Sequence, residues 1–303
     1  MYLTGFADEA GADVDVQIKA TKELGWKHIE MRNVRVDGSK ADNLHNVPDD
    51  VFQKVVERLQ KADVHVNCFG SAIGNWAKDI RDTLEISLEE TERAISRMKI
   101  LGTKLIRIMS YKLIPDAVLS CQMGAERIER LRIICGKFLD AGLQPVHENC
   151  SNYGGIGWRQ SLELIENIPG LKLVFDPGNP PPKVGGAVTW SGAYEPGWAW
   201  DFYSHVKPHI AYFHVKDCSI GKVTGTEGKH HHWAGEGDGD VRKIISDLIS
   251  SGYDGGFSIE PHIASVYHDP NVQNPADIQY KSYVEYGNRF MRLLCELGYP
   301  LSQ

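Results

Sequence analysis

The sequence lacks the features that mark membrane-spanning, secreted and disulfide-rich proteins. It has no run of the roughly 18 apolar residues needed to cross a membrane, and its first residues lack the basic and apolar regions of a secretion signal. Its six cysteines are scattered with no C-x-x-C pair, so neither a zinc knuckle nor a disulfide framework is indicated. We therefore expect reduced thiols, a cytoplasmic location and no membrane contact.

Positive charge is also scarce. The chain has 33 Lys and Arg against 40 Asp and Glu, a net charge of −7. Because nucleic-acid binding depends on clustered Lys and Arg, no nucleic-acid partner is expected. No Gly-rich phosphate-binding motif is evident, so nothing supports a phosphorylated substrate. With 42% hydrophobic and 24% charged residues, the 303-residue chain has the composition of a globular protein.

Short β-branched runs alternate with longer amphipathic stretches along the whole chain, which is typical of repeated βα units around a parallel sheet. We expect strands at residues 3–6, 28–31, 64–69, 105–109, 144–148, 171–175, 210–214 and 257–260. Helices are expected between them, as at 48–61, 84–100, 125–139, 241–249 and 278–297. The prediction is an α/β fold, a (β/α)8 TIM barrel forming a single domain over residues 1–303. Long βα loops should follow strands six, seven and eight.

Four of the expected strands end on a potential metal ligand: Glu148, Asp176, His214 and Glu260. The carboxyl ends of all strands in a parallel barrel meet at one mouth, so these four side chains should converge there. Taken singly, an Asp or Glu after a strand is more often a helix N-cap or an ion-pair partner. Together they predict a site for one divalent ion, with three carboxylates and one imidazole. Oxygen-rich ligands favour Mn²⁺, with Mg²⁺, Co²⁺ or Zn²⁺ as alternatives.

Several motifs resemble the sugar phosphate isomerase/epimerase superfamily, whose members have a xylose isomerase-like TIM barrel. The motifs are Gly5-Phe6-Ala7-Asp8-Glu9, His147-Glu148-Asn149, Phe175-Asp176-Pro177-Gly178-Asn179, His214-Val215-Lys216-Asp217, Gly235-Glu236-Gly237 and Ile259-Glu260-Pro261-His262. Its relatives include ketose 3-epimerases, hydroxypyruvate isomerase, inosose dehydratase, enzymes that cleave 3-keto-glycosides or C-glycosides and, more distantly, endonuclease IV. The resemblance implies that Glu148, Asp176, His214 and Glu260 bind the metal. In the epimerase branch, the residues that match Glu148 and Glu260 also move the proton.

At some positions this sequence differs from the pattern of a particular branch, and these differences indicate which branches of the superfamily it resembles less. The endonuclease branch has extra metal ligands where this chain has Asn179 and Lys229-His230-His231, of which only His231 matches, so its three-metal cluster is not expected. The ketose 3-epimerases commonly carry an Arg shortly after the strand-seven His, where this chain reads Lys216-Asp217-Cys218. That segment is nearer to the inosose dehydratase-like members.

The leading hypothesis is a metal-dependent sugar isomerase or epimerase. Glu148 and Glu260 would be the catalytic residues, removing and returning a proton next to a carbonyl through a metal-stabilised enediolate. The same metal site would serve a lyase or dehydratase acting on a keto-sugar, by inosose-type dehydration or by elimination from a 3-keto-glycoside or C-glycoside. A third interpretation is a non-catalytic barrel subunit that binds sugar. The expected ligand is a small sugar, and the chain is expected to form a dimer or tetramer or to join a partner subunit.

Around the metal we expect substrate contacts from His147, Asn179, Lys216, Asp217, Glu236, His262, Arg32 and Glu30. Each has a plainer interpretation beside this one. His147 precedes a ligand on its strand and by alternation should point into the core. Lys216 and Asp217 could pair with each other, and Glu30 with Arg32, while His262 could be an exposed loop residue.

Overall fold

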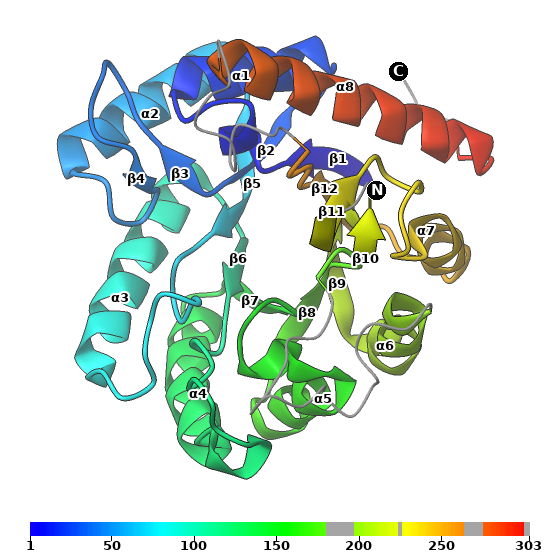
Figure 1. Ribbon diagram of the computed structural model, residues 1–303. Coiled ribbons are helices and arrows are strands. Elements are labelled where there is room, and N and C mark those ends of the chain that lie inside the picture. Colours follow the sequence, from blue (N-terminus) through cyan, green and yellow to red (C-terminus); the bar gives the residue numbers. More distant parts are fainter. Residues whose placement is uncertain (180–196, 224–225, 264–274, 300–303) are drawn as a thin grey trace.

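The expected parallel barrel is confirmed. A computed structural model describes residues 1–179, 197–223, 226–263 and 275–299, and Figure 1 shows a ring of strands surrounded by helices. The barrel strands are β1 (Tyr2–Gly5), β2 (His28–Met31), β5 (His65–Gly70), β6 (Leu105–Ile108), β7 (Gln144–Glu148), β8 (Lys172–Phe175), β9 (Ile210–Val215) and β12 (Gly256–Ile259). They pair in parallel in the order β1-β12-β9-β8-β7-β6-β5-β2, and a parallel bridge between Phe6 and Glu30 joins the two ends. Each expected strand is within one residue of the observed one.

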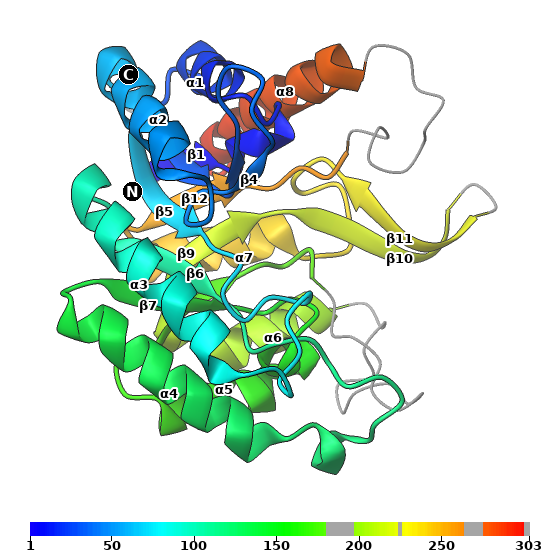
Figure 2. The same cartoon turned by 90° about the vertical axis from the view of Figure 1, so that its left-hand side faces the viewer.

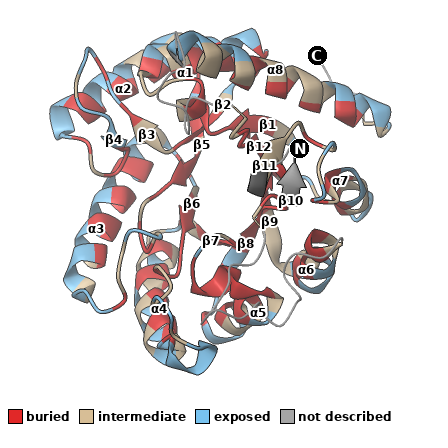
Figure 3. Ribbon diagram, in the orientation of Figure 1, coloured by how far each residue is buried: buried red, intermediate tan, exposed pale blue. Residues whose placement is uncertain are grey.

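The outer layer is a ring of helices. They are α1 (Val14–Glu23), α2 (Asp49–Ala62), α3 (Leu84–Leu101), α4 (Gly124–Asp140), α5 (Trp158–Asn167), α6 (Trp198–Val206), α7 (Val241–Ser250) and α8 (Pro275–Glu296), with short 3-10 turns at Ala7–Glu9, Leu119–Cys121, Tyr153–Ile156 and Lys207–His209. In α2 the apolar residues recur every three or four positions, so Val51, Val55 and Leu59 are buried on one face. Figure 3 shows this pattern around the ring, with inner faces buried and outer faces exposed.

Strand alternation divides the core into two parts. Val146, Val174 and Tyr212, from three consecutive barrel strands, form a small cluster with Cys68. Their neighbours Phe175, Phe213 and Phe257 belong to the large core between barrel and helices. Since successive side chains point to opposite faces, the first group fills the barrel interior. Residues two positions further along the same strands must then face the interior at the mouth.

Of the three long loops expected after strands six, seven and eight, the structure describes mainly the one after strand seven. Residues 180–196, after strand six, and 264–274, after strand eight, lie outside the described residues. The stretch after strand seven forms an antiparallel ribbon of β10 (Asp217–Val223) and β11 (Thr226–His232), which projects beyond the ring of helices in Figure 2. A second small ribbon pairs β3 (Asn33–Val34) with β4 (Asp42–Asn43). The sequence predicted a loop after strand seven, whereas the structure has two strands there. The segment is rich in Gly and His and lacks the alternation that would have predicted strands.

Among the described helices, none is long and apolar enough to span a membrane.

A buried histidine should make the stability of the fold depend on pH. His45 is fully buried after β4, and its Nε2 accepts the backbone N–H of Ala72 at 3.1 Å. Burial, reinforced by the cations Arg93, Lys78 and Arg97, lowers the pKa of His45 from 6.5 to about 3.

His45 takes up a proton more readily in the unfolded state than in the folded state. The free energy of unfolding therefore decreases as the pH falls from 6.5 toward 3. Between pH 7 and pH 5 the loss from His45 alone is about 2 kcal/mol. His45→Gln keeps an acceptor for Ala72 and cannot take up a proton. Urea unfolding at both pH values should show that the variant loses about 2 kcal/mol less than the parent protein. Equal losses in the two proteins would contradict this assignment.

Candidate metal centre and the cavity beside it

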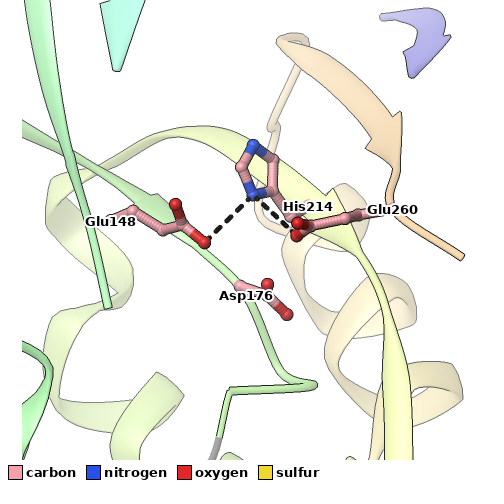
Figure 4. A group of neighbouring side chains, drawn as sticks. All are labelled: Glu148, Asp176, His214 and Glu260. Atoms are coloured by element: carbon pink, nitrogen blue, oxygen red, sulfur yellow. Dashed lines mark ion pairs between the residues drawn. The ribbon is translucent and has the colours of Figure 1, made fainter. Parts of the chain in front are cut away.

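Four side chains from neighbouring strands converge at the barrel mouth (Figure 4). Glu148 ends β7, His214 lies on β9, and Asp176 and Glu260 each follow directly after β8 and β12. All four are at most 4% exposed. One ligand atom from each lies within 4.8 Å of the others, and His214 Nδ1 is 3.5 Å from Glu148 Oε1 and 3.7 Å from Glu260 Oε2. The strands thus bring together four residues that are up to 112 positions apart in the sequence.

This geometry fits a divalent ion. An ion about 2.0–2.6 Å from each donor would leave opposite donors about 4–5 Å apart, as the group requires. His214 Nδ1 is buried and makes no hydrogen bond among the described residues, although it faces two carboxylates. A buried ring nitrogen without a hydrogen-bond partner is costly unless something else satisfies it. The donor set therefore matches a hard cation with oxygen ligands.

Glu30 fixes the orientation of the imidazole. Its carboxylate, fully buried on β2, lies 3.0 Å from His214 Nε2 and accepts a 2.6 Å hydrogen bond from Ser258. Binding of Nε2 to Glu30 leaves Nδ1 for the metal centre, which is the usual arrangement behind a metal-bound histidine. Burial alone would lower the pKa of His214, but Glu30 and Glu148 raise it to about 10. Glu30 therefore contacts His214 and does not line the cavity, although the sequence predicted it as a substrate contact.

Two arginines hold the two glutamates. Arg107 donates to Glu148 Oε2 at 2.9 Å, and Arg32 donates to Glu260 Oε1 at 3.3 Å. Both guanidinium groups lie over the ring of Phe6, at 5.0 and 4.5 Å from its centroid. Burial would raise the pKa of Glu148, but Arg107 and His214 lower it to about 2. Burial would also raise the pKa of Glu260, but Lys216 and other neighbouring cations hold it well below its usual value. Both glutamates are therefore ionised near neutral pH.

Lys216 supplies a further positive charge within the group. Its ammonium is 2.6 Å from Asp176 Oδ2 and 2.6 Å from Glu260 Oε2, and the residue is only 3% exposed. The alternative interpretation, in which Lys216 pairs with Asp217, is therefore not what the structure shows. Burial raises the pKa of Asp176 to about 6 even with this ammonium beside it. Lys216 balances part of the charge of the three carboxylates.

Two asparagines lock the ligand strands together. The side chain of Asn149 accepts from the Asp176 backbone N–H at 2.7 Å and donates to the Asp176 carbonyl at 2.9 Å. Asn179 donates to Glu148 Oε1 at 3.0 Å and to Asp176 Oδ2 at 2.8 Å. Because both contacts link the end of β7 to the end of β8, Glu148 and Asp176 keep a fixed spacing.

A cavity of about 350 Å³ opens beside the centre. Six of the sequence-predicted site residues line it: Arg32, Glu148, Asn179, Lys216, Glu260 and His262. The rest of its wall comes from Asn33, Asn43, Ser71, Ala72, Asn75, Trp76, Arg107, Met109 and Cys150. Asp176 and His214 are fully buried and lie outside this lining. The mixture of charged and polar groups with one exposed tryptophan suits a small polyhydroxylated ligand.

The remaining predicted residues lie elsewhere. His147 is fully buried with Nε2 3.0 Å from the hydroxyl of Ser110, in the core position that strand alternation predicts. Glu236 is exposed and pairs with Arg289 on α8 at 3.5 Å. Asp217 is fully buried at the base of the β10–β11 ribbon. None of the three lines the described cavity.

Asp217 organises the loop that follows the ribbon. Its carboxylate accepts backbone N–H groups from Gly235, Gly237 and Gly239 at 2.9–3.0 Å. A Cβ at Gly237 would lie 2.5 Å from Asp217 Oδ1, so the loop closes tightly around the carboxylate. Asp217→Ala would leave three amide groups without their acceptor and should cost about 2–3 kcal/mol. Urea unfolding checks this, and Asp217→Asn, which keeps one acceptor oxygen, should lose less; a loss below about 0.5 kcal/mol in Asp217→Ala would contradict it.

Sequence reasoning missed several residues of the site. Arg107 lay unnoticed inside an expected strand, although a charged residue in an apolar strand is itself a signal. Ser258, which contacts Glu30, gave no comparable signal, and Glu9, which contacts His262, was noted only as part of a motif. Their partners are more than 200 positions away in the sequence, and only the closure of the barrel brings them together.

Comparisons with known proteins agree with this architecture. A structure of a xylose isomerase-like TIM barrel protein from Mycobacterium smegmatis in complex with magnesium has a TM-score of 0.62 at 16% identity, covering 97% of each chain. A D-tagatose 3-epimerase-like protein gives 0.64 at 15% identity over 98% of each chain. The probable 3-DHS dehydratase AsbF from Bacillus anthracis gives 0.62 at 17% identity, over 93% of this chain and 97% of its own.

At these identities the structural matches show the fold alone. A search of curated protein sequences found no match. The sequence profile described as "Xylose isomerase-like TIM barrel" matches residues 18–281, which is most of the chain. The chain therefore belongs to the xylose isomerase-like TIM barrel family.

Proposed function

We propose that this protein is a divalent-metal-dependent sugar isomerase or epimerase that moves a proton on a carbon next to a carbonyl. The observation that carries the proposal is the group of Glu148, Asp176, His214 and Glu260, with its unsatisfied imidazole nitrogen, beside a polar cavity. Proteins with a similar structure include one described as D-tagatose 3-epimerase-like and one described as a probable dehydratase. A non-catalytic sugar-binding barrel would have no need of such a complete and buried ligand set.

The four grouped residues would hold the ion. A bound divalent cation supplies Lewis-acid stabilisation of the negative charge that develops on the sugar oxygens when the proton leaves. Mn²⁺ is the proposed ion because three of the four ligands are carboxylates, with Mg²⁺, Co²⁺ and Zn²⁺ as alternatives. The relative from Mycobacterium smegmatis was solved in complex with magnesium.

Glu148 and Glu260 are the proposed acid and base. They extend from β7 and β12, which are separated in the barrel by β8 and β9, so they approach the centre from different sides (Figure 4). One carboxylate removes the proton, and it or the other returns it to the opposite face or to the adjacent carbon. Return to the opposite face gives epimerisation, and return to the adjacent carbon gives isomerisation.

The cavity wall would bind the sugar hydroxyls. The Lys216 ammonium has three N–H groups, and two carboxylates take two of them, which leaves one for a ligand. Asn179, Arg32 and His262 also reach the wall from three different loops. We propose these four as substrate contacts, whereas Glu30 acts through the imidazole that it orients.

A cytoplasmic location and self-assembly are also proposed. None of the six cysteines forms a disulfide in the structure, which supports a reducing, cytoplasmic location. Assembly into a dimer or tetramer is expected from the long loops on this fold, and sedimentation analysis of the purified chain would measure it.

Deuterium exchange tests the proposed function whichever product the enzyme forms. Protein stripped with EDTA and reloaded with Mn²⁺ is incubated in D2O with D-fructose, D-tagatose, D-psicose and a 3-keto-glucoside, and NMR follows the proton next to the carbonyl. We expect Mn²⁺-dependent exchange on at least one sugar. His214→Ala should abolish it and lower the bound metal measured by elemental analysis. Absence of exchange on every sugar, or exchange equal in stripped and reloaded protein, would refute the proposal.

A further inference from the structure

A second and larger cavity adjoins the one beside the metal centre. Its volume is about 810 Å³, against about 350 Å³ for the cavity beside the four ligands. It lies between α1, the β3–β4 ribbon and α8, with Val16, Asp42 and Ala276 in its lining, and we call it the α1–α8 groove. Figures 1 and 2 show α1 and α8 side by side. Arg32 and Asn33 line both cavities, so the two meet at these residues.

Asp8 fixes the two residues that the cavities share. Its Oδ2 accepts hydrogen bonds from Arg32 Nε at 2.9 Å and from the backbone and side-chain N–H groups of Asn33 at 3.2 and 3.1 Å. The Asp8 side chain is only 5% exposed, and it also lines the groove. Its other oxygen, Oδ1, makes no hydrogen bond among the described residues. A buried acceptor of this kind is costly unless a further donor satisfies it, and a sugar hydroxyl is such a donor.

Arg32 connects the groove to the metal centre. Its Nε contacts Asp8 on the groove side, whereas its Nη1 donates to Glu260 Oε1 at 3.3 Å. The ring of Phe6, with its centroid 4.5 Å from the guanidinium, holds the group in place between them. One ligand that passes Arg32 would therefore contact the groove wall and also lie beside a proposed catalytic carboxylate.

The lining of the groove suits a neutral ligand with many hydroxyl groups. Four carboxylates and three cations face it among the described residues, so the wall favours an ion of neither sign. Carboxylates accept hydroxyl protons, and the guanidinium groups of Arg32 and Arg35 donate to hydroxyl oxygens. Tyr280 adds an aromatic ring, whose centroid lies 4.6 Å from the Lys19 ammonium. A few polar groups around an aromatic and apolar surface are typical of a small-molecule site.

We propose that the substrate is a neutral reducing disaccharide or longer oligosaccharide, with its carbonyl-bearing unit at the metal centre and its next unit in the α1–α8 groove. The inference rests on the proposed function, which supplies the reaction, and it adds the substrate class. The glycosidic bond is neither formed nor broken, so the product is an isomer of the substrate. Contacts with the unit remote from the reacting carbon supply binding energy that can raise kcat/KM.

Substrates that share one reacting unit test this proposal. Lactulose, maltulose and isomaltulose each carry a further hexose on the same D-fructose unit. Exchange of the proton next to the carbonyl is followed by NMR in D2O with the Mn²⁺-loaded protein. We expect kcat/KM on at least one disaccharide to exceed that on D-fructose by about 10- to 10²-fold. Equal or lower values on all three disaccharides would overturn the inference.

Two variants fill the groove. Ala41 and Ala276 line it and are exposed, so Ala41→Trp and Ala276→Trp add a large side chain there without disturbing the core. Each should lower kcat/KM on the preferred disaccharide to about the value on D-fructose. Ala125→Trp is the matched control, because Ala125 is exposed on α4 and does not line the groove. A preference for the disaccharide that survives both groove variants would show that its second unit binds elsewhere.

Calorimetry separates binding from catalysis. Lactulose is titrated into the parent protein and into Ala276→Trp after both have been stripped with EDTA, since the groove includes none of the four metal ligands. We expect the variant to bind at least about tenfold more weakly, and excess D-fructose to compete with lactulose in the parent protein. Equal affinities, or binding without competition, would contradict a ligand that spans both cavities. Exchange on free sugars but on no disaccharide would overturn this inference alone, whereas no exchange on any sugar would remove the proposed function as well.

Discussion

Glu260→Gln is expected to lower Mn²⁺-dependent proton exchange by about 10³-fold or more. Gln keeps the size of the side chain but removes the charge that Lys216 and Arg32 both contact. The substitution removes a metal ligand and a proposed base together. The first loss weakens retention of the ion, and the second removes the group that takes the proton.

Two measurements separate the loss of metal binding from the loss of the base. Elemental analysis gives the bound Mn²⁺, and exchange in D2O at saturating Mn²⁺ gives the rate with the site filled. If Glu260 is the base, the rate stays low even when occupancy is restored. Glu129→Gln is the matched control, because Glu129 is exposed on α4 and pairs with Arg132 on the same helix. Full activity of Glu260→Gln at saturating metal would remove Glu260 from the proposed catalytic role.

Lys216→Met should destabilise the protein in EDTA by about 3–5 kcal/mol. The ammonium is almost completely buried and lies 2.6 Å from two carboxylates, so its loss leaves Asp176 and Glu260 close together without their nearest cation. Uncompensated buried charge is among the few changes that cost this much. A bound divalent ion would supply positive charge in the same place.

Urea unfolding in EDTA and in saturating Mn²⁺ measures both parts of this expectation. The difference between variant and parent should be large in EDTA and markedly smaller in Mn²⁺, because the ion binds only the folded state. Lys137→Met is the control, since Lys137 is 38% exposed and pairs with Glu92 on the helix surface. A loss of the same size in both conditions would mean that Lys216 stabilises the fold by packing and not through the ligand charges.

Local pattern was enough to predict the barrel and the four ligands. Alternation of β-branched and amphipathic stretches defines the strands, because periods of two and of 3.6 residues are properties of the backbone itself. Strand ends follow from the same pattern, so Glu148, Asp176, His214 and Glu260 could be assigned to one mouth before any contact was known. The inward position of Glu148 and the core position of His147 follow from alternation alone.

Contacts between distant segments could not be predicted in this way. The sequence grouped Glu30 and Asp217 with the substrate contacts, yet Glu30 lies behind His214 and Asp217 lies inside a glycine-rich loop. Glu9 was noted only as part of a family motif and was given no role, although it contacts His262 where β1 adjoins β12. A side chain's partner depends on which strands adjoin, on their register and on rotamer choice, and these are settled only when the barrel closes.

The motifs of the sequence by themselves therefore indicated the family, and its periodicity and the residues that end each strand predicted the barrel and the four candidate metal ligands. Only the tertiary structure decided which charges face which: Lys216 toward two ligands, Arg107 and Arg32 toward the two glutamates, and Glu9 toward His262. Electrostatic interactions act over a few ångströms in space whatever the separation along the chain. For that reason the chemistry at the mouth can be argued from the folded arrangement and not from the order of the residues.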